Sequence, residues 1–169
     1  MDLRSAIRDI PDFPEKGILF RDITPVLKDG KLLSAAIDQI AQLAAKYEFD
    51  VIAGPESRGF IFGVPLAVKL GKGFVPIRKF GKLPHSTISK SYELEYGSAT
   101  IEIHTDAFEP GAKVLVVDDL LATGGTARAI LDLVREARAE VAASLFLIEL
   151  SGLGGRKGLG GNVESVITY

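Results

Sequence analysis

Hydrophobic positions along the chain follow two spacings, one typical of helices and the other of buried strands. Apolar residues recur at steps of three and four over residues 33–47, which predicts a helix that begins just after Asp29 and Gly30. The same spacing predicts helices at 60–70 and 127–134. Short apolar runs predict strands at 51–54, 74–78, 114–117, 142–150 and 163–167. This alternation favours an α/β fold, in which helices flank a mostly parallel, twisted sheet.

Three segments interrupt the alternation. Residues 9–26 contain three prolines and are expected to be irregular, forming a small N-terminal hood. Residues 80–105 combine a polar loop with an alternating strand at 100–104, which indicates a flexible lid hairpin. Residues 151–161 hold six glycines and are expected to form a mobile surface loop. We interpret residues 1–169 as a single domain with a hood and a lid, since long irregular segments in compact domains usually serve function or are disordered.

Composition narrows the classes of function. The 169 residues carry 20 Lys and Arg against 22 Asp and Glu, a net charge of −2, so no general basic field attracts nucleic acid or a membrane. The absence of cysteine excludes disulfides, thiolate catalysis and cysteine zinc sites. The two histidines, His85 and His104, lack the spacing of metal ligands. The N-terminus does not resemble a signal peptide and no apolar run approaches ~20 residues, so we expect a cytoplasmic location.

The most informative stretch leads from a buried strand through two acids into a turn of small residues. Asp118 and Asp119 follow the strand predicted at 114–117, and a helix is predicted after the turn. The turn has backbone N–H groups that can point inward, a helix N-terminus and threonine hydroxyls, which together form a phosphate site. An acidic turn before a helix is common in α/β proteins, but all four parts in order favour phosphate binding. The turn consists of Ala122, Thr123, Gly124, Gly125 and Thr126.

The two acids are expected to face something other than the phosphate, because a carboxylate would repel it. Ribose hydroxyls, which are donors, or a Mg²⁺ ion would suit Asp118 and Asp119. The turn is not a Walker loop, because the lysine after the glycines is missing. It is not a dinucleotide fingerprint either, because Gly124-Gly125 does not match G-x-G-x-x-G.

The stretch resembles the 5-phosphoribosyl pyrophosphate (PRPP) motif of the type I phosphoribosyltransferase family. Matching segments follow in family order at 12–14, 17–25, 56–60, 77–79, 81–84, 92–97 and 116–126. They are most similar to those of the adenine-specific members. The resemblance implies the family's α/β fold and transfer of the phosphoribosyl group from PRPP to N9 of adenine, giving AMP and pyrophosphate in purine salvage. It also implies a homodimer and a Mg²⁺ cofactor that PRPP carries near Asp118 and Asp119, with no site made by protein alone.

The pyrophosphate end of PRPP requires a local concentration of positive charge. Residues 71–92 contain no Asp or Glu but include Lys and Arg, a pattern that a solvated basic face would also give. The resemblance implies that pyrophosphate is held by Arg58, Arg78, Lys79 and Lys82, some of them across a dimer interface. The loop around Glu56 and Ser57 is expected to add backbone N–H groups, and the family associates it with a cis peptide between these two residues.

The hood is expected to hold the base. Phe20 offers a flat face for stacking, and Leu150 resembles the opposing apolar residue of the family, although either would also suit an ordinary core. The resemblance implies that the backbone at Leu19 reads the exocyclic amine and a ring nitrogen of adenine. Arg21 is expected either to contact the base or to anchor the hood through Asp22.

Glu95 matches the candidate catalytic carboxylate of the family. Glu93 and Glu95 alternate with Leu94 and Tyr96, so a strand would point both acids to one side, as an exposed hairpin face also would. A positioned carboxylate would manage the proton of adenine as N9 attacks C1′ of PRPP.

Two other functions stay open on the sequence. A phosphoribosyltransferase for a 6-oxopurine would use the same cradle with a different base. A PRPP-sensing regulator would keep the cradle without chemistry, although it would need an output module beyond the core, hood and lid.

Overall fold

The computed structural model describes residues 2–94 and 97–169, which form two compact units that divide after Gln39. The first unit contains a short 3-10 helix and the elements β1 (Arg8–Pro11), β2 (Leu19–Asp22), α1 (Thr24–Lys28) and most of α2 (Gly30–Ala44). The second contains β3 (Val51–Pro55), α3 (Arg58–Leu70), β4 (Gly73–Lys79), β5 (Thr87–Glu93), β6 (Ser98–His104), β7 (Lys113–Leu121), α4 (Gly125–Glu136), β8 (Glu140–Glu149) and β9 (Val163–Thr168).

The N-terminal segment is more regular than its proline content predicts. Strands β1 and β2 pair antiparallel, with Arg8 opposite Asp22, and these two side chains also form an ion pair at 3.5 Å. Asp22 then accepts a hydrogen bond from the backbone N–H of Thr24 at 2.9 Å, where α1 begins. The expectation of an irregular hood was wrong because cross-strand ion pairs stabilise a hairpin that hydrophobic spacing does not reveal. Asp29 caps α2, as predicted, by accepting hydrogen bonds from Lys31 and Leu32.

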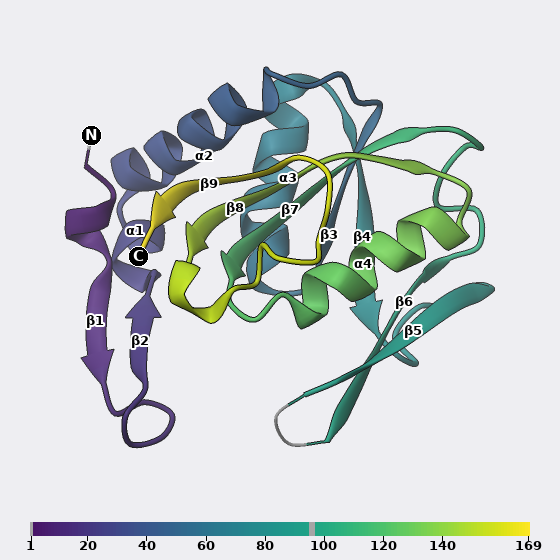
Figure 1. The fold of residues 1–169 in the computed structure, drawn as a ribbon. Helices are drawn as coiled ribbons and strands as arrows, with labels where there is room; N and C mark the ends of the chain where they lie inside the picture. The colour runs from purple at the N-terminus through teal and green to yellow at the C-terminus, as the bar shows by residue number, and fades with distance from the viewer. Residues whose placement is uncertain (1, 95–96) are drawn as a thin grey trace. The chain divides into compact units, whose positions relative to one another are not determined.

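The second unit is built on a seven-stranded sheet with the order β5-β6-β4-β3-β7-β8-β9. In the order of the sheet, the neighbouring strands β4, β3, β7, β8 and β9 run parallel. The β5–β6 hairpin of the lid adds two antiparallel strands beside β4. The α/β class, the mostly parallel sheet and the hairpin are therefore confirmed. Figure 1 shows α3 and α4 on opposite faces of this sheet. Apolar residues of β7 are buried on both faces, as a central parallel strand requires.

The chain reverses its direction of travel across the sheet between β3 and β7. From β3 it passes through α3 to β4 on one side, and from β7 it passes through α4 to β8 on the other. The ladder between β3 and β7 ends at Ala53 and Val116, whereas β7 continues to Leu121 along β8. This divergence opens a crevice at the carboxyl ends of the strands, where α/β sheets bind ligands.

One predicted boundary differs from the structure. Strand β7 extends past Val117, so that Asp118 and Asp119 lie within it rather than after it, because β8 supplies hydrogen-bonding partners as far as Leu121. No helix among the described residues has both the length and the apolar character that a membrane span requires.

Residues 151–161, expected to form a mobile surface loop, are mostly exposed turns. A short 3-10 helix occupies Ser151–Leu153, and Leu159 is buried at 3% exposure. Arg156, with its side chain 48% exposed, forms an ion pair at 2.5 Å with Glu149, which is only 6% exposed at its side chain. This ion pair ties the segment to the end of β8, a contact that the glycine content does not predict.

Gly54 is expected to tolerate no side chain, because a Cβ there would lie 2.6 Å from the backbone oxygen of Val117. We expect Gly54→Ala to lower the free energy of unfolding by about 1–3 kcal/mol, the usual cost of overpacking. Gly73→Ala is the matched control on the neighbouring strand, since its Cβ would lie 3.8 Å from the nearest atom. Urea denaturation of both variants measures the difference, and equal stabilities would contradict the expectation.

Candidate functional site

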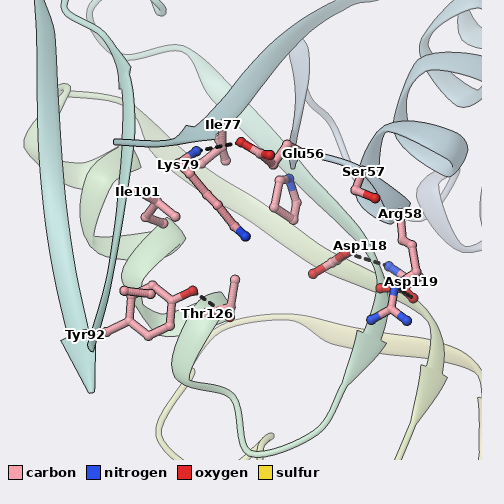
Figure 2. A pocket seen from close by; sticks show the side chains of 12 residues that line it. Glu56, Ser57, Arg58, Ile77, Lys79, Tyr92, Ile101, Asp118, Asp119 and Thr126 are labelled. Carbon is pink, nitrogen blue, oxygen red and sulfur yellow. Dashed lines mark hydrogen bonds and ion pairs between the residues drawn. The ribbon is translucent and has the colours of Figure 1, made fainter. Parts of the chain in front are cut away.

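A cavity of about 580 Å³ occupies the crevice between the ends of β3, β4 and β7 (Figure 2). The loop after β3, the end of β4, the lid hairpin and the start of α4 all contribute to its walls. The lining residues are Pro55, Glu56, Ser57, Arg58, Ile77, Lys79, Tyr92, Ala99, Ile101, Asp118, Asp119 and Thr126. The fold thus brings together residues from four of the segments singled out in the sequence, those at 56–60, 77–79, 92–97 and 116–126.

The loop between β3 and α3 approaches β7 closely. A Cβ on Gly59 would lie 3.1 Å from Oδ1 of Asp118, so glycine lets the start of α3 pass beside this acid. Among the described residues, the peptide bond between Phe13 and Pro14 is cis. The bond between Glu56 and Ser57, which the family associates with a cis conformation, is not cis here. Ser57 instead has a φ of +69°, a conformation that costs on the order of 1–3 kcal/mol and is typical of functional loops.

The carboxylate of Glu56 forms hydrogen bonds with three basic residues at the end of β4 and just after it. Its carboxylate accepts hydrogen bonds from the backbone N–H of Lys79 at 2.7 Å, Nζ of Lys82 at 2.9 Å and Nε of Arg78 at 3.2 Å. The Lys79 N–H contributes most to holding the pKa of Glu56 down at about 2. Arg78 and Lys82 therefore direct their charges at Glu56 and do not line the cavity, whereas Lys79 extends into it (Figure 2).

The two acids of β7 have different environments. Asp119 forms an ion pair with Nε of Arg58 at 2.9 Å, and its side chain is 8% exposed. Asp118 accepts a hydrogen bond from the backbone N–H of Asp119 at 2.8 Å. Burial raises the pKa of Asp118 well above its usual value, and the neighbouring charge of Asp119 adds to this effect. Asp119 is thus paired with the cation of Arg58, whereas Asp118 has a high affinity for a proton or a cation.

The predicted phosphate turn forms a second cavity of about 200 Å³, lined by residues 118–127 and Arg58. Gly124 has a φ of +85° and precedes the first residue of α4, so the unpaired N–H groups of the first helical turn lie at this cavity. Arg128 donates a hydrogen bond to the backbone oxygen of Thr123 at 3.2 Å. The two cavities share Arg58, Asp118, Asp119 and Thr126 and therefore form one continuous site.

The sequence did not identify Tyr92 and Arg128 as functional residues. The hydroxyl of Tyr92 forms a hydrogen bond with Oγ1 of Thr126 at 3.1 Å, which joins the lid hairpin to the start of α4 (Figure 2). Alternation along the strand at 87–93 indicates that Tyr92 has a defined side, but only the tertiary structure identifies its partner. Arg128 follows the glycine turn by a few residues, a position where a cation can reach back to the turn.

The predicted base-binding residues belong to different units. Leu150 follows β8 in the second unit, and Leu19, Phe20 and Arg21 lie on β2 in the first. Leu19 is 44% exposed, and the ring of Phe20 packs edge-on against Phe13 at 5.1 Å. Arg21 forms an ion pair with Asp9, its register partner across the hairpin. Glu95, the predicted catalytic residue, lies outside the described residues.

The donor set at the end of β7 fits a magnesium ion that a phosphate ligand carries. Asp118 and Asp119 present adjacent carboxylates, and Mg²⁺ usually binds one or two carboxylates together with substrate phosphates. Residues 2–94 and 97–169 contain no group of three or more His, Cys, Asp or Glu suited to a metal. His85 and His104, distant in sequence, do lie together, with ring centroids 5.8 Å apart.

The low pKa of Glu56 predicts a defined pH dependence of stability. Because its pKa falls from 4.5 to about 2 on folding, its ionised form stabilises the fold above pH 4.5, and this contribution is lost between pH 4.5 and about 2. We expect wild type to lose stability relative to Glu56→Gln in this interval, measured by denaturant unfolding at each pH. Glu48→Gln, at a side chain 93% exposed, is the control and should show no such trend.

Comparisons with known proteins agree with this geometry. A model of the phosphoribosyl transferase domain matches residues 25–157. An adenine phosphoribosyltransferase of Thermotoga neapolitana is 55% identical over 170 residues, which cover 100% of both chains. The crystal structure of adenine phosphoribosyltransferase from Thermoanaerobacter pseudethanolicus has a TM-score of 0.95 and 53% identity, covering 99% of this chain and 98% of that one.

A second solved structure contains ligands. Adenine phosphoribosyltransferase from Saccharomyces cerevisiae, complexed with D-2,5-dideoxy-2,5-imino-altritol 1,6-bisphosphate and adenine, has a TM-score of 0.92 and 41% identity, covering 97% of this chain and 96% of that one. The family match spans most of the chain, and the relatives match it from end to end. The chain therefore belongs to the phosphoribosyl transferase family, among its adenine phosphoribosyltransferases.

Proposed function

We propose that this protein transfers the 5-phosphoribosyl group of PRPP to N9 of adenine, giving AMP and pyrophosphate in purine salvage. The observation that carries this proposal is the continuity of the two cavities, which offers one site for an anion at each end and carboxylates between them. The names of the close relatives support adenine as the base. The C1′–N9 bond forms as the bond from C1′ to pyrophosphate breaks, and the proton on N9 leaves.

The 5-phosphate is assigned to the smaller cavity, lined by the phosphate-binding loop at residues 122–126. The first-turn N–H groups of α4, its dipole and the hydroxyls of Thr123 and Thr126 all favour an anion there. The hydrogen bond between the hydroxyls of Tyr92 and Thr126 supports a role for the lid in 5-phosphate binding, because it joins this end of the site to the hairpin.

The ribose hydroxyls and a PRPP-bound Mg²⁺ are assigned to Asp118 and Asp119. The carboxylate of Asp118, whose pKa desolvation raises, gains stability when a hydroxyl donor or a cation approaches. When bound, Mg²⁺ would neutralise charge on the leaving pyrophosphate. Asp119 holds Arg58 at the boundary between the two cavities, where its guanidinium can be offered to phosphate oxygens.

Pyrophosphate is assigned to Arg58, Lys79 and the N–H groups of the loop at Glu56 and Ser57. Lys79 reaches the cavity from the end of β4, and Arg58 lines both cavities. Arg78 and Lys82 belong to the same proposal, although in the described conformation Glu56 neutralises them. Glu56 then serves to keep the end of β4 and the loop after β3 together.

Adenine is assigned to Leu19, Phe20, Arg21 and Leu150. A backbone N–H donor beside a carbonyl acceptor matches 6-aminopurine, while a 6-oxopurine presents the opposite pattern and would leave polar groups unpaired. The yeast relative, which was crystallised with adenine, supports this choice of base. The homodimer and the cytoplasmic location remain predictions of the sequence.

A purine panel tests the proposed function. We expect pyrophosphate release from PRPP with adenine in the presence of Mg²⁺, and at least about 100-fold slower release with hypoxanthine, because unpaired buried polar groups cost on the order of 1–3 kcal/mol each. A preference for hypoxanthine would favour the 6-oxopurine alternative. Binding of PRPP without release in the presence of any purine would favour the regulator.

Glu95 is proposed as the acid–base residue that manages the proton of adenine. We expect Glu95→Ala to lower kcat by roughly 10²–10⁴-fold, the usual contribution of a positioned carboxylate, with a much smaller change in the affinity for PRPP. Glu93→Ala, two residues earlier on the same hairpin, is the matched control and should retain kcat. Steady-state rates and PRPP titrations of both variants decide, and a wild-type kcat in Glu95→Ala would remove it from the reaction.

A further inference from the structure

We infer that Gly155, held by the ion pair between Arg156 and Glu149, is a positioning element for the phosphate-binding loop. These residues lie in segment 151–161, to which neither the sequence nor the proposed reaction assigns a role. The inference rests on the proposed function, because its readout is the binding of the 5-phosphate end of PRPP. It makes Gly155 and Arg156 positioning residues and not catalytic ones, since neither lines either cavity.

Gly155 lies directly against the backbone of the phosphate-binding loop. A Cβ on Gly155 would lie 2.2 Å from the backbone oxygen of Ala122 and 3.1 Å from the backbone nitrogen of Gly124. In the other direction, a Cβ on Gly124 would lie 2.6 Å from the backbone oxygen of Gly155. The two glycine backbones are therefore in mutual contact, and the loop cannot shift toward segment 151–161 without moving Gly155.

Arg156 fixes the position of Gly155. Its guanidinium donates to Glu149 through Nε at 2.9 Å and Nη2 at 2.5 Å, a two-point contact that defines orientation as well as distance. It also donates to the backbone oxygen of Val163, at the start of β9. Ser165 donates to the same carboxylate at 2.8 Å. The residue next to Gly155 is thus tied to two strands of the sheet at once.

Glu149 connects this anchor to the strand that leads into the loop. It is the last residue of β8 and lies opposite Leu121, which directly precedes Ala122. The backbone N–H of Leu150 donates to the oxygen of Leu121 at 2.9 Å. The hydrogen bonds from Arg156 are the main cause that lowers the pKa of Glu149, so the carboxylate is held ionised for this pairing. The loop is consequently held at its strand end by Leu121 and along its backbone by Gly155.

This arrangement predicts that variants of segment 151–161 affect the binding of PRPP more than the binding of adenine. A variant that shifts Gly155 moves the N–H groups that face the 5-phosphate, whereas the base-binding residues Leu19, Phe20 and Arg21 lie on β2 and keep their own contacts. A shift of about 1 Å in a positioned group can reduce catalytic efficiency by about 100-fold. The expected signature is a rise in the KM for PRPP without an equal rise in the KM for adenine.

Gly155→Ala is the decisive variant, with Gly152→Ala as its matched control. Neither glycine has a φ in the left-handed region, and a Cβ on Gly152, in the same segment, would meet no atom within 4 Å. We expect Gly155→Ala to raise the KM for PRPP, and the dissociation constant of ribose 5-phosphate measured by calorimetry, on the order of 10–100-fold. Gly152→Ala should leave both constants within about twofold of wild type.

Arg156→Met and Arg156→Lys form the second test. Loss of the two-point contact in Arg156→Met should raise the KM for PRPP and the dissociation constant of ribose 5-phosphate. Arg156→Lys, which keeps the charge, should restore part of the affinity for both ligands. Phe108→Leu, at a buried core residue between β6 and β7 that lines neither cavity, calibrates a general loss of melting temperature. If Arg156→Met does not fold, Gly155→Ala decides alone.

The outcomes separate the inference from the function on which it rests. Unchanged constants in Gly155→Ala would overturn it, as would equal rises in both KM values that follow melting temperature as in Phe108→Leu. A wild-type protein that binds ribose 5-phosphate but releases no pyrophosphate with any purine would contradict the proposed function instead, because the calorimetric comparison does not require turnover.

Discussion

The site depends on one feature of the sheet, the extension of β7 beyond its ladder with β3. Hydrogen bonds between these strands end at Val116, but β8 continues to pair with β7 as far as Leu121. The last part of β7 therefore has one paired edge that keeps it rigid and one open edge that faces the crevice. Asp118 and Asp119 lie in this part, so their position is determined by strand pairing and not by a flexible loop. The same pairing delivers the chain into the phosphate-binding loop.

The second constraint is electrostatic. Three carboxylates, those of Glu56, Asp118 and Asp119, line the cavity. Glu56 accepts from the backbone N–H of Lys79 and from the side chains of Lys82 and Arg78, and Asp119 accepts from Arg58. The pair with Asp119 holds Arg58 at the cavity, whereas Arg78 and Lys82, paired with Glu56, do not line it. Burial and the neighbouring charge of Asp119 raise the pKa of Asp118 well above its usual value, so this carboxyl differs from Glu56 and Asp119 in its electrostatic environment.

Local patterns predicted the elements but misjudged the irregular segments. Helical spacing at 33–47, apolar runs and the glycine turn all correspond to elements of the structure, because each depends on neighbours in sequence. The segment at 9–26 was predicted to be irregular but contains paired strands, and an ion pair that the sequence analysis did not predict lies in each of the segments at 8–22 and 149–156. Arg8 with Asp22 and Arg156 with Glu149 join residues that no periodic pattern connects.

The sequence by itself determined the α/β class, the glycine turn before α4 and the position of two acids near the end of β7, since short-range spacing encodes all three. Only the tertiary structure decided that Arg78 and Lys82 turn to Glu56, that Tyr92 meets Thr126, and that Gly155 lies against Ala122. The physical reason is that a side chain's charge and volume are local properties, whereas its partner is chosen by strand order and register. Those are fixed only when the whole sheet has formed.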